Sequence, residues 1–326
     1  MQNAWQPTCR LEYLRLRAQI LQQIRGFFSA RNVLEVETPI LGHACGTDPQ
    51  LDFFSSTYDL GYKKEQLFLQ TSPEFAMKRL LCAGSGSIFQ IAKAFRNGES
   101  GRFHNPEFTM LEWYQVGYNL VDLMTEVDEL LNFLSAEYLT LQATQQFSYQ
   151  EIFLRLTGLD PLGFSYDEYS AFASSKNQPE ALTLCGKDHN LWLDFIFSHH
   201  VQPSLGQSGF CLVYGYPATQ SSLACVNIKN PKIVDRVEVF FKGIELGNGY
   251  YELQDAQEQS QRFDTEIQCR QETNRPVVVK DELLISALQQ GLPECSGIAI
   301  GLDRLLMILT QSASIEEVLS FPIQRV

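Results

Sequence analysis

Clustered cysteines and long apolar runs are both missing from this sequence. Its eight cysteines are scattered singly, with no CxxC pair among the 326 residues. Zinc sites and dense disulfide frameworks need closely spaced cysteines, so both are disfavoured and a reducing cytoplasm is the expected location. Polar residues interrupt every apolar stretch well before the roughly 18 residues that cross a bilayer, which disfavours a membrane protein.

Positive charge is scarce as well. The chain has 25 Lys and Arg against 38 Asp and Glu, a formal net charge of −13. An acidic surface repels phosphate backbones, so stable nucleic-acid binding is not expected. The one noticeable basic cluster, within residues 10–31, interleaves with apolar residues at helical spacing. That pattern favours a solvated helix face over a nucleic-acid surface.

The sequence does contain alternating strand-like and helix-like segments, with 44% hydrophobic residues. The patterns predict strands over residues 33–39, 67–71, 88–95, 108–116, 210–214 and 236–246. They predict helices over residues 11–30, 120–139, 256–271 and 281–290, one that opens at 72–74, and a final one from 303. Mostly antiparallel strand neighbours with helices between them predict one α+β domain over residues 1–326, an antiparallel sheet flanked by helices.

A loop between two predicted strands concentrates charge and glycine. Arg96 follows an apolar strand directly, so its guanidinium is held, and Glu99 and His104 lie in the same loop. Arginine grips phosphate or carboxylate through two parallel hydrogen bonds, and glycine lets backbone N–H groups approach a ligand closely. The loop therefore indicates an anion site. The alternative is an exposed hairpin loop with incidental charges.

The strand after this loop carries an acid among apolar residues. Alternation places Phe108, Met110, Glu112 and Tyr114 on one face and Trp113 on the other. A carboxylate in that setting is costly to bury without a partner. Glu112 beside Tyr114 suits a substrate ammonium group, and an internal salt bridge to an arginine explains the glutamate equally well.

Two further segments place functional groups beside glycines. Glu245 and Glu252 flank Gly-Asn-Gly, interpreted as a tight turn, so both carboxylates can converge on a magnesium ion, which favours one or two carboxylates plus phosphate oxygens. A hairpin with surface acids is the competing interpretation. Gly297, Ala299 and Gly301 leave one strand face bare, so that a flat ligand or another backbone can lie against it.

Arg304 stands at the start of the last predicted helix. A cation there opposes the helix dipole, and a bound anion would resolve the conflict; tight packing with Arg304 reaching a surface acid is the alternative. Together the segments match carboxylate activation by ATP, in which a carboxylate oxygen attacks the α-phosphorus and pyrophosphate leaves. Arg96 would hold the α-phosphate and the substrate carboxylate, and Arg304 the γ-phosphate. Mg²⁺ on Glu245 and Glu252 would bridge the phosphates.

In this order the segments resemble motifs 1, 2 and 3 of the class II aminoacyl-tRNA synthetases, and of their lysyl branch in particular. The three motifs correspond to residues 33–39, 95–114 and 297–305. Residues 71–74, 104–110 and 245–253 are similar to lysyl-synthetase segments almost letter for letter. Motif 1 begins close to Met1, so no anticodon-binding OB-fold domain is expected before it. Length and flanking residues look closest to the elongation factor P–(R)-β-lysine ligases, truncated paralogues of the lysyl enzymes.

The resemblance implies formation of a β-lysyl-adenylate from ATP, transfer to a lysine side chain of elongation factor P, and a homodimer formed through motif 1. Position by position, it implies catalytic roles for Arg96, Glu245 and Arg304. It implies ATP-binding roles for those three and for Asn97, Gly98, Glu99, His104, Asn105, Phe108, Leu246 and Gly301. It implies amino-acid-binding roles for Ser72, Pro73, Glu74, Glu112, Tyr114, Asn248, Glu252 and Ala299, and metal-binding roles for Glu245 and Glu252.

One position departs from the family pattern. Gly98 stands where motif 2 usually has glutamate, and Glu99 follows it. Either Glu99 reaches back through the flexible glycine, which is the favoured interpretation, or backbone or water makes that contact to ATP. Three other functions are weighed: a truncated synthetase that charges tRNA, a paralogue that activates aspartate, and a catalytically silent regulator. Glu112 would repel the acidic side chain of aspartate, which disfavours the second alternative. The retained motif arginines disfavour a catalytically silent protein. The residues do not distinguish α-lysine from β-lysine.

Overall fold

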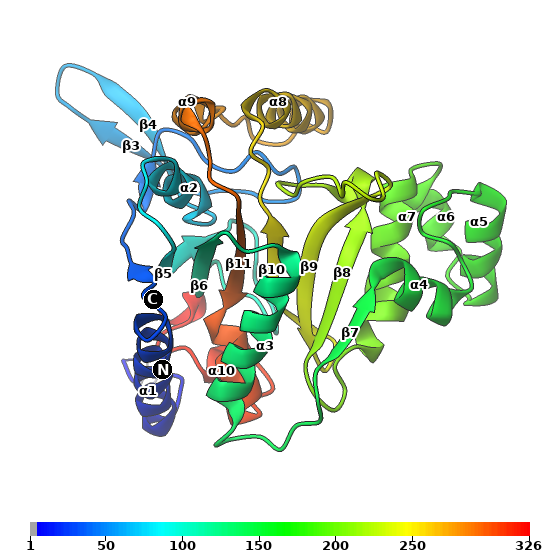
Figure 1. Ribbon diagram of the computed structural model, residues 1–326, viewed down its shortest axis with the longest axis horizontal. Coiled ribbons are helices and arrows are strands. Elements are labelled where there is room, and N and C mark those ends of the chain that lie inside the picture. The colour runs from blue at the N-terminus through cyan, green and yellow to red at the C-terminus, as the bar shows by residue number, and fades with distance from the viewer. Residues whose placement is uncertain (1–4) are drawn as a thin grey trace. The chain divides into compact units, whose positions relative to one another are not determined.

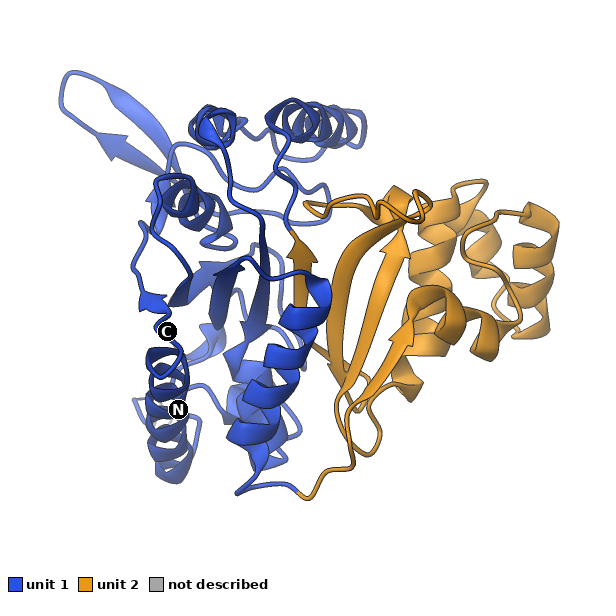
Figure 2. Cartoon of the chain, in the orientation of Figure 1, with its two compact units in different colours: residues 1–139, 252–326 blue, residues 140–251 orange. Residues whose placement is uncertain are grey.

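The computed structural model describes residues 5–326; residues 1–4 of the predicted domain lie outside the described residues. The described chain divides into two compact units (Figure 2). Unit 1 comprises the residues up to Leu139 and those from Glu252 onward, and unit 2 spans Thr140–Tyr251 between them. The single catalytic domain over residues 1–326 stays a prediction. Within the described chain, no helix combines the length and apolar character needed to span a bilayer.

Unit 1 is built from a sheet and the helices around it (Figure 1). Its N-terminal elements are α1 (Leu11–Ser29), β1 (Leu34–Glu35), β2 (Leu41–Gly42), β3 (Ser55–Asp59), β4 (Lys64–Leu69), α2 (Glu74–Cys82), β5 (Ile88–Phe95), β6 (Glu107–Val116) and α3 (Leu120–Ser135). Its C-terminal elements are α8 (Ala256–Glu272), α9 (Glu282–Gln290), β11 (Cys295–Gly301) and α10 (Leu302–Thr310). These positions confirm most of the predicted helices and strands, although the strand expected over residues 33–39 is reduced to β1.

Strand β6 is the centre of unit 1, because β5 and β11 both pair with it in antiparallel fashion. Strand β1 adds to β5 in parallel, and β2, β4 and β3 form a small antiparallel sheet of their own. In this register Glu112 lies opposite Gln90 of β5 and Ala299 of β11. The predicted antiparallel pairing of neighbouring strands is therefore confirmed for β5 and β6, and the α+β class with it.

The face of β6 that carries Trp113 packs against α1 and α3. Phe28 of α1 stacks on Phe89 at 4.6 Å between ring centres and lies 5.4 Å from the ring of Trp113. The Trp113 indole Nε1 donates a 2.9 Å hydrogen bond to the buried carboxylate of Glu126 on α3. Because side chains alternate along a strand, Glu112 is left on the opposite face. The predicted alternation along β6 is confirmed.

Unit 2 consists of four strands and a group of short helices. Its elements are β7 (Gln145–Ser148), α4 (Tyr149–Thr157), α5 (Tyr166–Ser175), α6 (Glu180–Cys185), α7 (His189–Ile196), β8 (Cys211–Pro217), β9 (Ile233–Phe241) and β10 (Ile244–Tyr251). Strands β7 and β8 run parallel, whereas β8–β9 and β9–β10 are antiparallel. Tyr149, Trp192 and Phe197 are buried among the core residues that join the helices to the strands.

The hairpin of unit 2 corrects two sequence expectations. The strand predicted over 236–246 is two strands, and the turn between them is Lys242-Gly243, with φ of 48° and 73°. Two consecutive positive φ values define the type I′ turn that suits the twist of a hairpin. The Gly-Asn-Gly segment instead continues β10, with a register shift between Glu245 and Gly247. Glu245 and Glu252 therefore do not flank a turn.

Candidate active site

Polar side chains gather on the face of β6 that points away from Trp113. The Tyr114 hydroxyl donates a 2.7 Å hydrogen bond to Glu112 Oε1, and the Ser72 hydroxyl donates a 2.8 Å bond to Glu112 Oε2. Ser72 Oγ also accepts a 3.0 Å bond from the Glu74 backbone N–H, so it orders the start of α2, which begins after Pro73. The structure thus brings together four predicted amino-acid-binding residues around one buried carboxylate.

A lysine that sequence reasoning missed completes this cluster. Lys78 follows Glu74 by one turn of α2, and its Nζ lies 2.7 Å from Glu74 Oε1 and 2.6 Å from Glu252 Oε2. The side chains of Lys78 and Glu252 are only 2% and 1% exposed. The signal was available, because Glu and Lys four residues apart on a helix with buried apolar neighbours are expected to pair. Lys78, Glu74 and Glu252 form one buried ion-pair network.

Gly297 on β11 shows how tightly this cluster is packed. A Cβ at Gly297 would fall well inside van der Waals contact with Tyr114 Cδ1 and Cε1, and 2.9 Å from Glu252 Oε1. The bare strand face expected to receive a flat ligand or a backbone is, at Gly297, filled by the Tyr114 ring. The glycine thereby lets Tyr114 and Glu252 share one pocket, defined from here on as the amino-acid pocket: Ser72, Glu74, Lys78, Glu112, Tyr114, Glu252 and Gly297.

Burial sets the electrostatics of the amino-acid pocket. Loss of solvent, with the charge of Glu74 adding to it, raises the pKa of Glu112 to about 7. Burial likewise raises the pKa of Glu252 to about 8, although Lys78 acts in the opposite direction. For Lys78, burial alone would lower the pKa, but Glu252 and Glu74 together raise it. Three carboxylates thus share one ammonium group, and the pocket is short of positive charge.

Arg96 leads the loop between β5 and β6. Its Nη1 lies 3.7 Å from Glu99 Oε1, and its guanidinium lies 5.1 Å from the centre of the Phe108 ring. Its Nε is buried with no hydrogen-bond partner among the residues the structure describes. A buried donor without a partner is costly, and an anionic ligand would supply one. Gly98 has φ of 80°, so the left-handed turn places Glu99 beside Arg96, while its contact to ATP stays a prediction.

The second predicted arginine lies in the first turn of α10. Arg304 Nη2 lies 2.7 Å from His104 Nε2, and Arg304 Nε donates to the Phe103 carbonyl at 3.2 Å. The preceding residue, Asp303, is buried and accepts a 2.7 Å hydrogen bond from the Thr109 backbone N–H. Gly301 supplies the N-terminal cap of the helix. Arg304 and His104 are therefore held together at a helix N-terminus, where an anion is favoured.

The other predicted residues of this loop make protein contacts. The Asn105 side chain donates to the Glu107 carbonyl at 2.6 Å and accepts from the Ile323 N–H at 3.0 Å. It therefore fixes the loop from within, and its contact with ATP stays a prediction. The Asn97 backbone N–H donates to the Asp52 carbonyl at 2.9 Å. The loop is tied through Asp52 to a segment far back in the chain.

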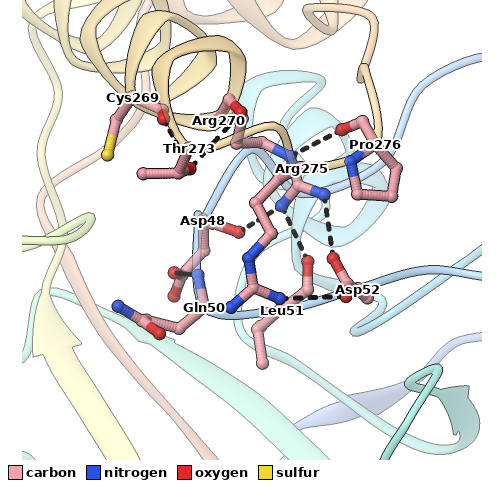
Figure 3. Close-up of polar contacts among 9 residues, drawn as sticks. All are labelled: Asp48, Gln50, Leu51, Asp52, Cys269, Arg270, Thr273, Arg275 and Pro276. Carbon is pink, nitrogen blue, oxygen red and sulfur yellow. Dashed lines mark hydrogen bonds and ion pairs between the residues drawn. The ribbon is translucent and has the colours of Figure 1, made fainter.

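That segment is held by Arg270, a second residue that sequence reasoning missed (Figure 3). Arg270 is fully buried on α8, and its Nη1 donates to the carbonyls of Asp48 and Leu51 at 2.7 and 2.8 Å. Its Nη2 lies 3.2 Å from Asp52 Oδ1, and its Nε donates to the Pro276 carbonyl at 2.9 Å. One guanidinium thus joins α8 to the segment that meets Asn97.

Three predicted residues belong to unit 2. Asn248 Oδ1 accepts from Arg236 Nε at 3.2 Å, and its amide donates to the Tyr250 hydroxyl at 2.8 Å. Arg236 also pairs with Glu238. Burial raises the pKa of Glu238 to about 7, with Arg236 opposing and Glu245 adding to the shift. Leu246 is buried. Asn248 and Glu245 therefore lie around one buried charged network of unit 2.

The predicted magnesium pair fits these contacts only in part. Among residues 5–326, no group of three or more His, Cys, Asp and Glu side chains is arranged to hold a metal ion. Magnesium needs only one or two carboxylates besides phosphate oxygens and water. Glu252, however, lies in unit 1 with one oxygen on the Lys78 ammonium. Glu252 is therefore the less suitable of the two as a magnesium ligand, and the metal role of Glu245 stays a prediction.

Comparisons with known proteins agree with the motifs. The family model of class II tRNA synthetases (D, K and N) matches residues 8–325. A Vibrio parahaemolyticus protein named elongation factor P–(R)-beta-lysine ligase is 45% identical over 324 residues, which cover 99% of each chain. Proteins of the same name from Vibrio cholerae and Pasteurella multocida are 44% and 43% identical, over at least 98% of each chain. The chain therefore belongs to the class II tRNA synthetase family, in the branch of the elongation factor P–(R)-β-lysine ligases.

Proposed function

We propose that this protein activates (R)-β-lysine with ATP and transfers the β-lysyl group to a lysine side chain of elongation factor P. The names of its relatives support the reaction. The observation that carries it to this chain is the amino-acid pocket, where Glu74 and Glu252 share the ammonium of Lys78 and a third buried acid, Glu112, is held within the described chain only by hydroxyl groups. Buried carboxylates need cationic partners, and a diamino acid brings two.

In the first step, a carboxylate oxygen of the substrate attacks the α-phosphorus of ATP, and the bond to pyrophosphate breaks. Arg96 would neutralise the charge that builds on the α-phosphate, because its buried Nε–H has no partner among the described residues and can donate a hydrogen bond to a phosphate oxygen. Arg304 and His104, at the start of α10, would hold the outgoing phosphates. In the second step, the amine of the acceptor lysine attacks the acyl carbon and loses a proton, an amide forms, and AMP leaves.

The proposal extends to assembly and to magnesium. Mg²⁺, bound with ATP, would neutralise phosphate charge, and Glu245 is its proposed protein ligand. We also propose a homodimer through motif 1 and a cytoplasmic location. Leu34, Ile40 and Leu41, in and beside motif 1, are 54%, 43% and 46% exposed, so apolar surface is present where a second copy would pack.

The test is mass spectrometry of elongation factor P after incubation with the protein, ATP and each lysine isomer. A mass gain with (R)-β-lysine, absent without ATP, is expected. An Arg96→Met variant should lose this activity and keep its fold, because it removes the guanidinium and retains an apolar stem. Lysylation of tRNA by the purified protein would instead support a truncated synthetase. No mass gain with any isomer would end the proposed function.

A further inference from the structure

Lys78 is a buried cation to which the motifs give no role. It lies on α2, the helix that opens with the predicted substrate residues, and none of the amino-acid-binding residues that the sequence predicted carries a positive charge. Its ammonium is 2.7 Å from Glu74 and 2.6 Å from Glu252, within direct ion-pair distance of both. A lysine with 2% of its side chain exposed is rare unless it is paired.

The charges of the pocket can be counted from these contacts. Glu74, Glu112 and Glu252 carry three negative charges when ionised, and Lys78 carries one positive charge. The pocket is therefore left with two negative charges. A diamino acid whose carboxylate is turned toward ATP brings two ammonium groups into the pocket, which balances the count. A monoamino acid would leave one buried carboxylate without a cation, a state that proteins avoid.

We propose that Lys78 is a positioning and specificity residue that reduces the pocket to two uncompensated carboxylates, so that the pocket accepts two ammonium groups. This inference rests on the proposed function. The Lys78 ammonium forms ion pairs with one carboxylate oxygen of Glu74 and one of Glu252. The Tyr114 and Ser72 hydroxyls meanwhile hold both oxygens of Glu112. Lys78 thus fixes two of the three acids in place.

The count also predicts an exchange of protons for substrate. Without substrate, carboxylates that outnumber cations hold protons, in agreement with the raised pKa values of Glu112 and Glu252. Arriving ammonium groups displace those protons, so affinity for the diamino acid should rise as pH increases through about 7 to 8. The titratable groups that face the pocket acids are Glu74, Lys78 and Cys82 of α2, Glu112 and Tyr114 of β6, Glu252, and Glu266 of α8. Glu266 stays outside the charge count, because it accepts a hydrogen bond from Thr47 and the cation Arg262 opposes its charge.

The experiment is the pH dependence of KM for (R)-β-lysine in ATP–pyrophosphate exchange. Lys78→Met removes the ammonium and keeps an apolar stem, so the remaining acids hold their protons more tightly. The pH range over which KM falls should lie about one pH unit higher in the variant than in the wild type. At pH 7 the KM of the variant should therefore be about tenfold higher. The value of kcat should change by less than about threefold, because the ammonium of Lys78 is held by Glu74 and Glu252 and acts through them. Lys64→Met, the same change at a side chain that is 72% exposed, is the matched control and should leave both values unchanged.

A double variant keeps the test decisive if Lys78→Met does not fold. Lys78→Met with Glu74→Gln removes one charge of each sign, so the pocket keeps two uncompensated carboxylates. It should fold and return the pH profile toward that of the wild type. An unchanged profile in Lys78→Met, or a double variant that is unfolded or no closer to the wild type, would overturn the role of Lys78. Wild-type protein that exchanges with no lysine isomer would instead overturn the proposed function.

Discussion

Replacing Gly297 with alanine would place a methyl group where the Tyr114 ring already lies. The added carbon would approach two ring carbons to well under 3.0 Å and Glu252 Oε1 to 2.9 Å. Non-bonded carbons settle about 3.5–4.0 Å apart, so the ring must move by roughly 1 Å. The 2.7 Å hydrogen bond from Tyr114 to Glu112 would then break.

The size of the effect follows from these two losses. Overpacking of this kind costs about 1–3 kcal/mol, and a buried carboxylate that loses a donor adds about 1–3 kcal/mol. We therefore expect the free energy of unfolding to fall by roughly 2–5 kcal/mol. If about half of that loss appears in substrate binding, kcat/KM for (R)-β-lysine falls by about five- to seventyfold.

Urea denaturation and pyrophosphate exchange measure the two effects separately. Gly26→Ala is the matched control, because Gly26 is an exposed residue of α1 and a Cβ there meets nothing within 4 Å. It should stabilise the protein by about 0.5–1 kcal/mol, since alanine is the better helix former. A Gly297→Ala protein as stable as the wild type, with an unchanged KM, would refute the packing argument.

Three further outcomes are expected. Arg270→Met leaves buried backbone carbonyls without their hydrogen-bond donor, so the free energy of unfolding from urea denaturation should fall by about 3–5 kcal/mol. A fall below about 1 kcal/mol would contradict the proposed role of Arg270 in joining the two segments. Asp303→Asn weakens the buried hydrogen bond to the Thr109 backbone, so we expect the free energy of unfolding to fall by about 1–3 kcal/mol and KM for ATP to rise. An unchanged KM for ATP would show that this hydrogen bond does not shape the nucleotide site. Glu112 and Glu252 have raised pKa values, so the folded protein binds their protons more tightly than the unfolded chain does. Stability of the substrate-free protein should therefore fall as pH rises from 4.5 through about 8, and urea midpoints that climb over this range would show the sign to be wrong.

Sequence patterns correctly predicted features that depend on a single helix or strand, and the family motifs identified the class of the fold. Alternation along β6 separated Glu112 from Trp113 correctly, because strand periodicity alone decides the face. The position of Arg304 at a helix start was also predicted, since helix ends follow from local residues. That Ala299 lies opposite Glu112 became known only from the register, because pairing between distant strands leaves no local trace.

The missed features all join distant segments. Lys78 pairs with Glu252, and Arg270 binds the carbonyls of residues 48 and 51, but spacing carries no information about such contacts. The hairpin turn was misplaced for a different reason. Gly-Asn-Gly has the composition of a turn, yet the turn formed at Lys242-Gly243, where lysine adopts a positive φ that its side chain does not favour.

The insertion of unit 2 has a consequence for the newborn chain. Unit 1 is interrupted after Leu139 and resumes at Glu252, the pocket residue that pairs with Lys78. As the chain leaves the ribosome, β6 is complete long before its partner β11 is made, so it waits as an open edge strand, and Lys78 waits with only one of its two acids. Exposed edges invite wrong pairing. The segment from Glu252 through β11 therefore both covers this edge of β6 and supplies the second acid of Lys78, which makes nascent chains cut short before β11 candidates for aggregation and for chaperone binding.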